Sequence, residues 1–364
     1  MTRHFLSEEA QARFTAARFE AVARIGRIVA EEKCEFVVVA GDVFETNQVD
    51  RRTVRRALEA MAQIPAPVFL LPGNHDPLDA ATVFRSSVFT THCPPNVRVL
   101  ADGTPVVLRD GVEVVGAPWT SKRPLRDLVA QTFAALDVAP PNTVRIAVAH
   151  GALDSLAPDP ANPAIIERAS AEALLGESKI HYLALGDRHS LTQAGDSKRI
   201  YYAGTPEPTS DVEVDPGQVL VVDCSPSECV ARSIRVGAWR FLRHEAQLAN
   251  TSDVNALGDF IRALPAKETT VLKLALVGTL SLSVHGDLEE LLDDQRHLFA
   301  AILQSSSRSE LVVKPSDDDF QNISLSGFAS DALAELRALA ANVDAAPAAE
   351  DALGLLVRLA QRPA

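Results

Sequence analysis

The sequence predicts an α/β fold with layered packing, followed by a smaller α+β domain. Through the first 210 residues, short apolar and β-branched runs alternate with segments of helical periodicity, which is typical of helices packed on sheets. A strand–helix–strand pattern follows between residues 270 and 313 and indicates a second domain. A length of 364 residues is sufficient for two domains.

Local signals place the elements of the first domain. Ser7 and the acidic residues after it mark a helix start, and apolar residues recur at helical spacing to about residue 32. Further helices are expected at 50–62 and 122–137, and short strands separated by Asp-Gly turns over 96–118. Four apolar runs are expected to be buried strands, and they span residues 36–40, 67–71, 146–149 and 182–185.

The second half begins after about residue 208. A strand pair is expected from 219–222 and 230–244, and a strand–helix–strand unit from 270–277, 288–303 and 311–313. Two helices are then expected at about 330–342 and 350–361. The predicted regions are a first domain, a second domain and C-terminal helices, at 1–210, 211–325 and 326–364, with the first boundary between about 208 and 250.

Composition excludes some classes of protein. The chain is 47% hydrophobic and 23% charged, as in ordinary globular proteins, and it has no apolar run of membrane-spanning length and no apolar N-terminal signal core. Cys224 and Cys229 could pair in a hairpin, but no CxxC pair occurs, and we expect reduced thiols in a cytoplasmic protein.

Charge is distributed unevenly along the chain. Residues 211–364 hold 13 Lys and Arg against 23 Asp and Glu, whereas residues 1–210 hold 22 against 25. The second half should therefore repel a phosphate backbone, and any nucleic-acid contact is expected from the first half.

Four polar signatures stand at the ends of the four apolar runs. Because ligands of open α/β sheets bind at the carboxyl ends of the strands, their side chains should meet at one rim. Carboxylate, amide and imidazole groups together suit a divalent transition metal. The signatures are Gly41-Asp42-Val43-Phe44-Glu45, Gly73-Asn74-His75-Asp76, His150-Gly151 and Gly186-Asp187-Arg188-His189.

The order and spacing of these signatures resemble the calcineurin-like metallophosphoesterase superfamily. The match covers about residues 36–207. The phrases at 36–44 and 202–206 are similar to the SbcD-type DNA-repair exonucleases within it, and the strand–helix–strand unit is similar to that family's capping domain. The resemblance implies a layered sheet sandwich and a metal-dependent phosphodiesterase.

The resemblance also implies a pair of divalent ions, with manganese preferred. Asp42 would bridge the two ions, Asn74, His150 and Asp187 would complete the shell of one, and His189 would bind the other. Such a pair clamps the phosphate and activates the attacking water. A ligating imidazole usually needs a hydrogen-bond acceptor behind it, and the sequence does not identify that acceptor.

Two residues carry the implied proton chemistry. His75 would face the scissile phosphate as proton donor or transition-state stabiliser, and Asp76 would hold it. Taken alone, each signature also has a structural interpretation as a turn or helix cap. Four such signatures in the family's order favour the metal site.

The chain departs from the family pattern in two places. Asp187 stands where the family usually has His, which favours harder ions such as manganese. The family's opening strand with its Asp-x-His or Asp-x-Gln motif is not found before Asp42, so the first ion would retain only Asp42 and His189. We therefore expect that Met1 is an internal methionine and that ten to fifteen residues precede it.

A group of arginines follows the first signature. At i,i+4 spacing on the helix at 50–62 they would form a basic stripe, either for a phosphate backbone or simply facing solvent. The group consists of Arg51, Arg52, Arg55 and Arg56.

The resemblance indicates partners as well as a substrate. The substrate would be DNA ends, and the C-terminal helices would either dock on the coiled coil of an SMC-like, SbcC-type ATPase or cover the cap's own sheet. A homodimer is a further possible assembly. The alternatives are a metallophosphoesterase for small phosphoesters or nucleotides, which the acidic second half keeps open, and a catalytically impaired binding partner of an ATPase.

Overall fold

The computed structural model describes residues 3–305, 307–314 and 327–340, with residues 349, 352, 353, 355 and 356. The chain forms two compact units. The first comprises Met1–Arg3 and Gln11–Trp239, and the second His4–Ala10 and Arg240–Ala364. The division falls at Trp239, within the interval expected from the sequence but beyond residue 210, because a strand pair after that residue belongs to the first unit.

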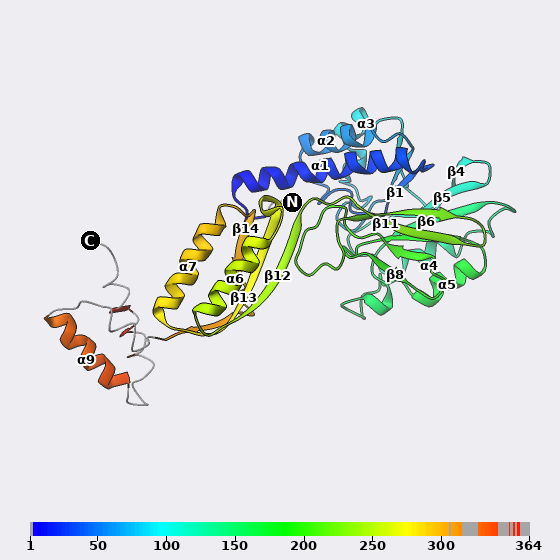
Figure 1. The fold of residues 1–364 in the computed structure, drawn as a ribbon. Helices are drawn as coiled ribbons and strands as arrows, with labels where there is room; N and C mark the ends of the chain where they lie inside the picture. The colour runs from blue at the N-terminus through cyan, green and yellow to red at the C-terminus, as the bar shows by residue number, and fades with distance from the viewer. Residues whose placement is uncertain are drawn as a thin grey trace. The chain divides into compact units, whose positions relative to one another are not determined.

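The first unit contains two larger sheets, whose strands are drawn as arrows in Figure 1, and a separate two-stranded hairpin. The smaller is parallel, in the order β1-β2-β3, and the larger has the order β4-β5-β6-β7-β9-β8, with its middle strands parallel. The strands of the smaller sheet are β1 (Val37–Val39), β2 (Val68–Leu70) and β3 (Val97–Val99). Those of the larger are β4 (Val106–Arg109), β5 (Val112–Ala117), β6 (Val144–His150), β7 (Tyr182–Gly186), β8 (Thr192–Ala194) and β9 (Ile200–Tyr202). All four predicted runs are strands, and so are the short strands expected over 96–118; β1, however, is half-buried rather than buried.

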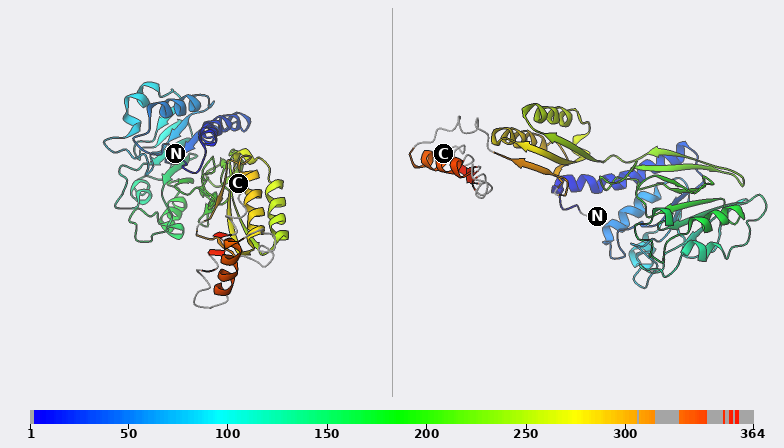
Figure 2. Two further views of the ribbon diagram at one scale, coloured as in Figure 1. Left: turned by 90° about the vertical axis from the view of Figure 1, so that its left-hand side faces the viewer. Right: turned by 90° about the horizontal axis from the view of Figure 1, so that it is seen from below.

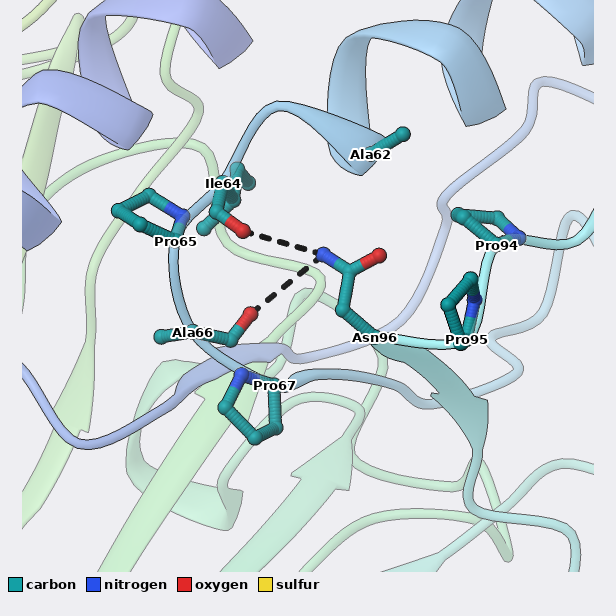
Figure 3. A pocket seen from close by; sticks show the side chains of 8 residues that line it. All are labelled: Ala62, Ile64, Pro65, Ala66, Pro67, Pro94, Pro95 and Asn96. Atoms are coloured by element: carbon teal, nitrogen blue, oxygen red, sulfur yellow. Dashed lines mark hydrogen bonds between the residues drawn. The ribbon is translucent and has the colours of Figure 1, made fainter.

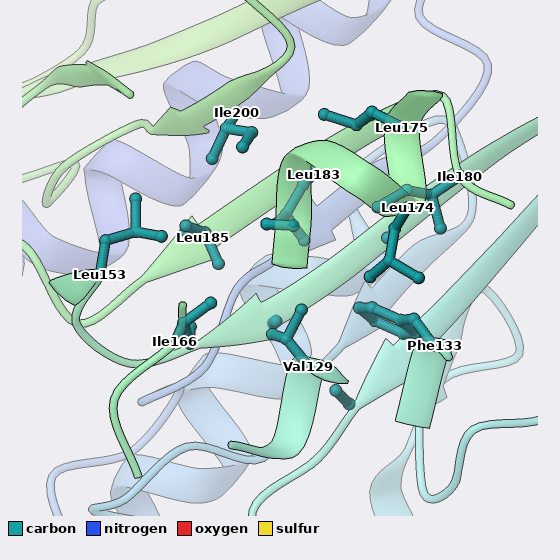
Figure 4. Close-up of a cluster of buried hydrophobic side chains, with 14 of the residues drawn as sticks. Val129, Phe133, Leu153, Ile166, Leu174, Leu175, Ile180, Leu183, Leu185 and Ile200 are labelled. Atoms are coloured by element: carbon teal, nitrogen blue, oxygen red, sulfur yellow. The ribbon is translucent and has the colours of Figure 1, made fainter. Parts of the chain in front are cut away.

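Three apolar layers hold the two sheets and their helices together. Alternate residues of each strand point to opposite faces, so Phe69 and Val148 fill the layer between the sheets, while Leu70 and Ala149 face helices. One outer layer lies under α1 (Glu8–Glu31), α2 (Arg51–Ala62) and α3 (Ser87–His92). The other lies under α4 (Leu128–Phe133) and α5 (Arg168–Gly176) and is drawn in Figure 4. The result is the α/β sandwich that the sequence predicts.

One helix of the first unit is shorter than expected. The sequence predicts a helix over 122–137, but α4 begins at Leu128 because the Asp127 carboxylate accepts hydrogen bonds from Val129 N and Ala130 N and caps it there. The residues before Asp127 form turns and bends.

The first unit ends in an antiparallel hairpin of β10 (Gln218–Cys224) and β11 (Cys229–Arg235). Cys224 and Cys229 are partners in its register and form a disulfide, so the expectation of reduced thiols is wrong for this pair. Direct opposition across an antiparallel pair brings the two Cα atoms close enough for the bond. The unit closes on Trp239, which is fully buried against the Phe14 ring, with 4.9 Å between ring centroids.

The second unit is a parallel sheet covered by two helices. β13 (Thr270–Leu280) pairs with β12 (Arg240–Leu248), β14 (Ala301–Gln304) and β15 (Glu310–Val313). Helices α6 (Thr251–Ala263) and α7 (Leu282–Arg296) bury their apolar faces on it (Figure 2). The helix expected at 288–303 ends at Arg296, and the apolar residues that follow it form β14 instead.

Of the two predicted C-terminal helices, the first is α9 (Phe328–Ala340). Most of the second lies outside the described residues. No described helix is both long enough and apolar enough to cross a membrane.

Candidate metal centre

The carboxyl ends of β1, β2, β6 and β7 meet where the two sheets of the first unit come together. Close backbone approach brings them there, because a Cβ at Gly41 would lie 2.1 Å from His150 Nδ1 and one at Gly186 would lie 1.7 Å from Ala40 O. Only glycine fits at these two positions. The motif glycines therefore allow the ends of the two sheets to touch.

His150, the last residue of β6, is the centre of the cluster. Its Nε2 lies 2.9 Å from Asn74 Oδ1, 3.4 Å from Asp42 Oδ2 and 3.8 Å from Asp187 Oδ1. The His150 side chain is 1% exposed, whereas those of Asp42 and Asp187 are 28% and 38% exposed. The imidazole is thus buried behind the carboxylates, which reach solvent.

The opposite nitrogen of the His150 ring decides its tautomer. Nδ1 lies 2.8 Å from the carbonyl oxygen of Ala40, which can only accept, so Nδ1 carries a hydrogen. The Nε2 lone pair of the neutral ring then faces the carboxylates. A backbone carbonyl behind the ring is the usual arrangement for a metal-ligating histidine, and Ala40 is the acceptor that the sequence does not reveal.

The Asn74 amide faces the same point. When Asn74 Oδ1 points towards His150, this oxygen has only hydrogen-bond acceptors around it, namely His150 Nε2 and the Asp42 carboxylate. With the amide turned, Nδ2 would donate to His150 Nε2 at 2.9 Å and to both Asp42 oxygens at 3.1 Å. A cation at this point would satisfy the same acceptors and would draw the amide oxygen inwards.

The charges of the cluster are coupled. Burial opposes ionisation of Asp42, but the hydrogen bond and charge that His150 supplies in its protonated form hold the pKa of Asp42 below its usual range. Burial lowers the pKa of His150, but Asp42, the Ala40 carbonyl and Asp187 together raise it, and the net shift is upward. Burial also raises the pKa of Asp187. Two carboxylates beside one imidazole leave an excess of negative charge that suits a cation.

Both carboxylate residues have a strained backbone. Asp42 has φ +52° and Asp187 has φ +92°, a region that residues other than glycine rarely occupy. Strain of this kind persists where the surrounding structure enforces it and is concentrated at functional sites. The turn after each strand therefore aims its carboxylate at His150.

His189 lies outside this cluster and is half exposed. Its Nδ1 contacts Glu213 Oε1 at 2.8 Å and Thr209 Oγ1 at 3.1 Å. Hydrogen bonding to Glu213 raises the pKa of His189. The Glu213 side chain is only 4% exposed, so it orients the ring and leaves Nε2 for another ligand. No sequence spacing marks Glu213, which follows His189 by 24 residues.

His75 is exposed, and its ring is not held by Asp76 as predicted. His75 Nδ1 lies 3.0 Å from the carbonyl oxygen of Glu45. Asp76 is fully buried and accepts hydrogen bonds from Gly73 N at 2.7 Å and Phe44 N at 2.9 Å. Burial raises the pKa of Asp76 to about 6, although the two hydrogen bonds from Gly73 N and Phe44 N lower it. The Asp76 carboxylate therefore points into the protein and links the loop that carries Phe44 to the loop that carries Gly73.

The predicted basic stripe is divided. Arg56 lies over the Phe19 ring, 4.1 Å from its centroid, and so faces α1. Arg51 and Arg55 face α3 and line a hollow there, and Arg52 is exposed. Arg188, between two predicted ligands, donates from Nε to Thr192 Oγ1 at 2.7 Å.

The donors fit one divalent cation by chemical type. Donor atoms about 2.1 Å from a shared ion lie roughly 3–3.5 Å apart, and the separations from His150 Nε2 to Asn74 and Asp42 are close to this. Counting only His, Cys, Asp and Glu, no group of three or more among the described residues is arranged to hold an ion. A metal site at this point would therefore also need the amide oxygen of Asn74.

A layered α/β fold with this donor set at its strand ends defines a class, the metal-dependent phosphoester hydrolases. The family model for calcineurin-like phosphoesterases matches residues 9–191, which is half of the chain. The chain therefore belongs to the calcineurin-like phosphoesterase family, and it is a metal-dependent phosphoesterase that uses divalent ions.

Solved structures show more distant likenesses. The crystal structure of TT1561 of Thermus thermophilus is 11% identical, with a TM-score of 0.40 over 60% of this chain and 94% of that chain. A second crystal structure is 14% identical, with a TM-score of 0.39 over 60% of this chain and 95% of that chain. No curated protein matches the sequence.

Proposed function

We propose that this chain hydrolyses phosphodiester bonds at DNA ends, as the SbcD-type exonucleases that its motifs resemble do. The observation that carries the hydrolytic part is the convergence of His150 Nε2, Asn74 Oδ1 and the Asp42 carboxylate, with His150 Nδ1 bound to Ala40 O. DNA as the substrate is supported by the arginines of α2, which follow the first motif loop.

Each side chain has a role in the proposed site. Asp42, Asn74, His150 and Asp187 would hold one divalent ion, and Asp42 with His189 the other. When bound, two such ions clamp the phosphate and lower the pKa of the attacking water. Glu45 O fixes the tautomer of His75 by accepting from its Nδ1, so Nε2 faces outwards and can meet the phosphate or leaving group.

Manganese is the ion we propose. Asp187 adds a second carboxylate to the cluster around His150, and carboxylates favour harder ions. An Asp187→His variant should shift the metal preference from manganese towards zinc.

The C-terminal helices are the proposed docking segment for an SMC-like ATPase. Within α9, Phe328 is 88% exposed and Leu339 is 43% exposed, which leaves apolar surface for a partner coiled coil. The cytoplasm is the proposed location, and a homodimer remains an alternative assembly.

Hydrolysis of small phosphoesters is the second candidate. It is favoured by the acidic second half of the chain, because residues 211–364 contain 23 Asp and Glu but only 13 Lys and Arg. That surface would repel a long polyanion but not a small ester.

The test compares two substrates across ionic strength. Manganese-dependent release of nucleotides from a duplex end should fall steeply between 50 and 200 mM salt, by about tenfold or more. Cleavage of bis-p-nitrophenyl phosphate by the same preparation should change little. Asp42→Asn should abolish both reactions and serves as the control for contaminating nucleases. Cleavage of the small ester alone would refute the DNA substrate, and cleavage of neither would refute the hydrolytic site.

A further inference from the structure

A basic hollow lies between α2 and α3, with a volume of about 340 Å³. It is lined by Arg51, Arg55, Ser87, Val88, Thr91 and His92. Its lining residues thus include two guanidiniums, two hydroxyls and an imidazole, and all of these groups can donate hydrogen bonds.

The helices are arranged so that these groups share the hollow. Arg51 and Arg55 stand at i,i+4 on α2, as do Ser87 and Thr91 on α3, so each pair lies on one helix face. Arg51 Nη2 lies 3.4 Å from Ser87 Oγ, which joins the two faces.

Little negative charge offsets the two guanidiniums. Arg55 Nη2 is 3.6 Å from Glu59 Oε1, but both side chains are more than half exposed, so the pair is weak. The nearby Asp50 carboxylate caps α2, accepting from Thr53 N at 2.9 Å and Thr53 Oγ1 at 2.6 Å. The hollow is thus suited to an anion.

A second hollow in the same unit shows the contrast. It is lined by four prolines and small apolar residues, and its one polar side chain, Asn96, already donates to Ile64 O and Ala66 O (Figure 3). That hollow has no charged side chain in its lining. A lining with positive charge is therefore found in the hollow between α2 and α3 but not in this second one.

The basic hollow is built on the loops of the metal centre. α2 follows the loop that carries Asp42, and α3 follows the loop that carries His75. The buried Asn47 side chain ties the two loops together, donating to Pro77 O at 3.0 Å and accepting from Val83 N at 3.0 Å. A group bound in the hollow would therefore lie on helices that follow the same two linked loops as the site.

We propose that this hollow is a phosphate subsite, which holds a backbone phosphate of the nucleic-acid substrate other than the one that is cleaved. Arg51 and Arg55 supply the charge, and Ser87, Thr91 and His92 supply further donors. The proposal rests on the proposed function, because it names a second contact of the same substrate. Of the four arginines in the predicted stripe, the proposal assigns phosphate binding to Arg51 and Arg55 and not to Arg52 or Arg56.

The test measures DNA binding by the full chain in EDTA, so that no cleavage occurs. Anisotropy of a labelled duplex is followed across ionic strength for wild type and for Arg51→Gln with Arg55→Gln. The double variant should bind about tenfold or more weakly at low salt, and the slope of log affinity against log salt should fall by about 1–2. The matched control is Arg27→Gln with Arg98→Gln, which removes two exposed charges outside the hollow.

Three outcomes are distinct. A reduced slope in the double variant alone supports the subsite. Equal reductions in both variants, or none in either, overturn it, even if manganese-dependent DNA cleavage is intact. A reduced slope without any DNA cleavage by wild type supports the subsite and refutes the nuclease. Thr91→Ala should give a smaller loss of affinity than either arginine substitution, since a neutral donor contributes less than a charged one.

Discussion

Polar groups lie at both ends of β6 and its neighbouring strands, and the two ends differ in how these groups are satisfied. At the amino ends, Glu113 Oε1 lies 2.5 Å from Arg145 Nε, and Arg145 Nη1 donates to Asp137 O at 2.7 Å and Lys179 O at 2.8 Å. His181 Nδ1 accepts from Arg145 N at 3.0 Å. The buried charges of Glu113 and Arg145 are thus paired with each other.

At the carboxyl ends the balance is reversed. The cluster around His150 has two carboxylates and, in the neutral ring, a lone pair that faces them. The distance between the two networks along β6 is only five residues, from Arg145 to His150. A closed polar network of this kind suits stabilisation of the fold, whereas the open one suits the binding of a ligand, as we propose.

The largest expected effect comes from the open end. Asp42→Asn keeps the shape of the side chain and tolerates the left-handed backbone, but it removes the charge that would bridge two ions. We expect manganese-dependent phosphodiesterase activity to fall by about 10³-fold or more, with little change in thermal stability. Activity within tenfold of wild type would show that Asp42 is not a ligand.

The next effect comes from the closed end. Glu113→Gln leaves the buried Arg145 guanidinium without its counter-ion, so the free energy of unfolding should fall by about 3–5 kcal/mol. Urea unfolding measures this. Glu35→Gln is the control, because Glu35 pairs with Arg109 at the same 2.5 Å but in solvent and should cost less than about 1 kcal/mol. If Glu113→Gln and Glu35→Gln lowered the free energy of unfolding equally, burial of the Glu113–Arg145 pair could not be the cause of the loss.

Glu213 tests how the exposed half of the site is held. Glu213→Gln removes the carboxylate behind His189 Nδ1, and manganese affinity should weaken by about 10–100-fold. Calorimetric titration of the metal-free protein measures the affinity. Glu228→Gln, on an exposed turn, should leave the affinity unchanged. An unchanged affinity in Glu213→Gln would show that His189 does not bind the ion through an oriented ring.

The smallest expected effect is a pH dependence at the closed end. Burial lowers the pKa of His181, and the charges of Arg199 and Arg145 lower it further. The native state therefore favours the neutral ring, and stability is complete above the unfolded pKa of about 6.5 and declines as pH falls below it. His181→Asn keeps an acceptor for Arg145 N and cannot titrate, so its unfolding free energy should vary less between pH 7 and pH 5. A steeper decline in the variant would refute this.

Local pattern determined much of the fold. Periodicity and caps located α1 and α2, and the apolar runs located β1, β2, β6 and β7 with their motif residues at the carboxyl ends. The predicted end of the helix over 288–303 was wrong, because the short apolar run at its end fits a helix or a strand equally well. Pairing with β13 decided in favour of β14.

What the tertiary structure alone decided are contacts between residues far apart in sequence. The Ala40 carbonyl that sets the tautomer of His150 is 110 residues from it, and the Glu113–Arg145 pair spans 32 residues. Asp76 was assigned to the His75 ring on adjacency in sequence, yet the fold turned it towards Phe44 N across 32 residues. Sequence identified which residue types stand at strand ends, because that depends on neighbours along the chain. Which atom each side chain faces depends on how the two sheets approach each other, and no local pattern contains that information.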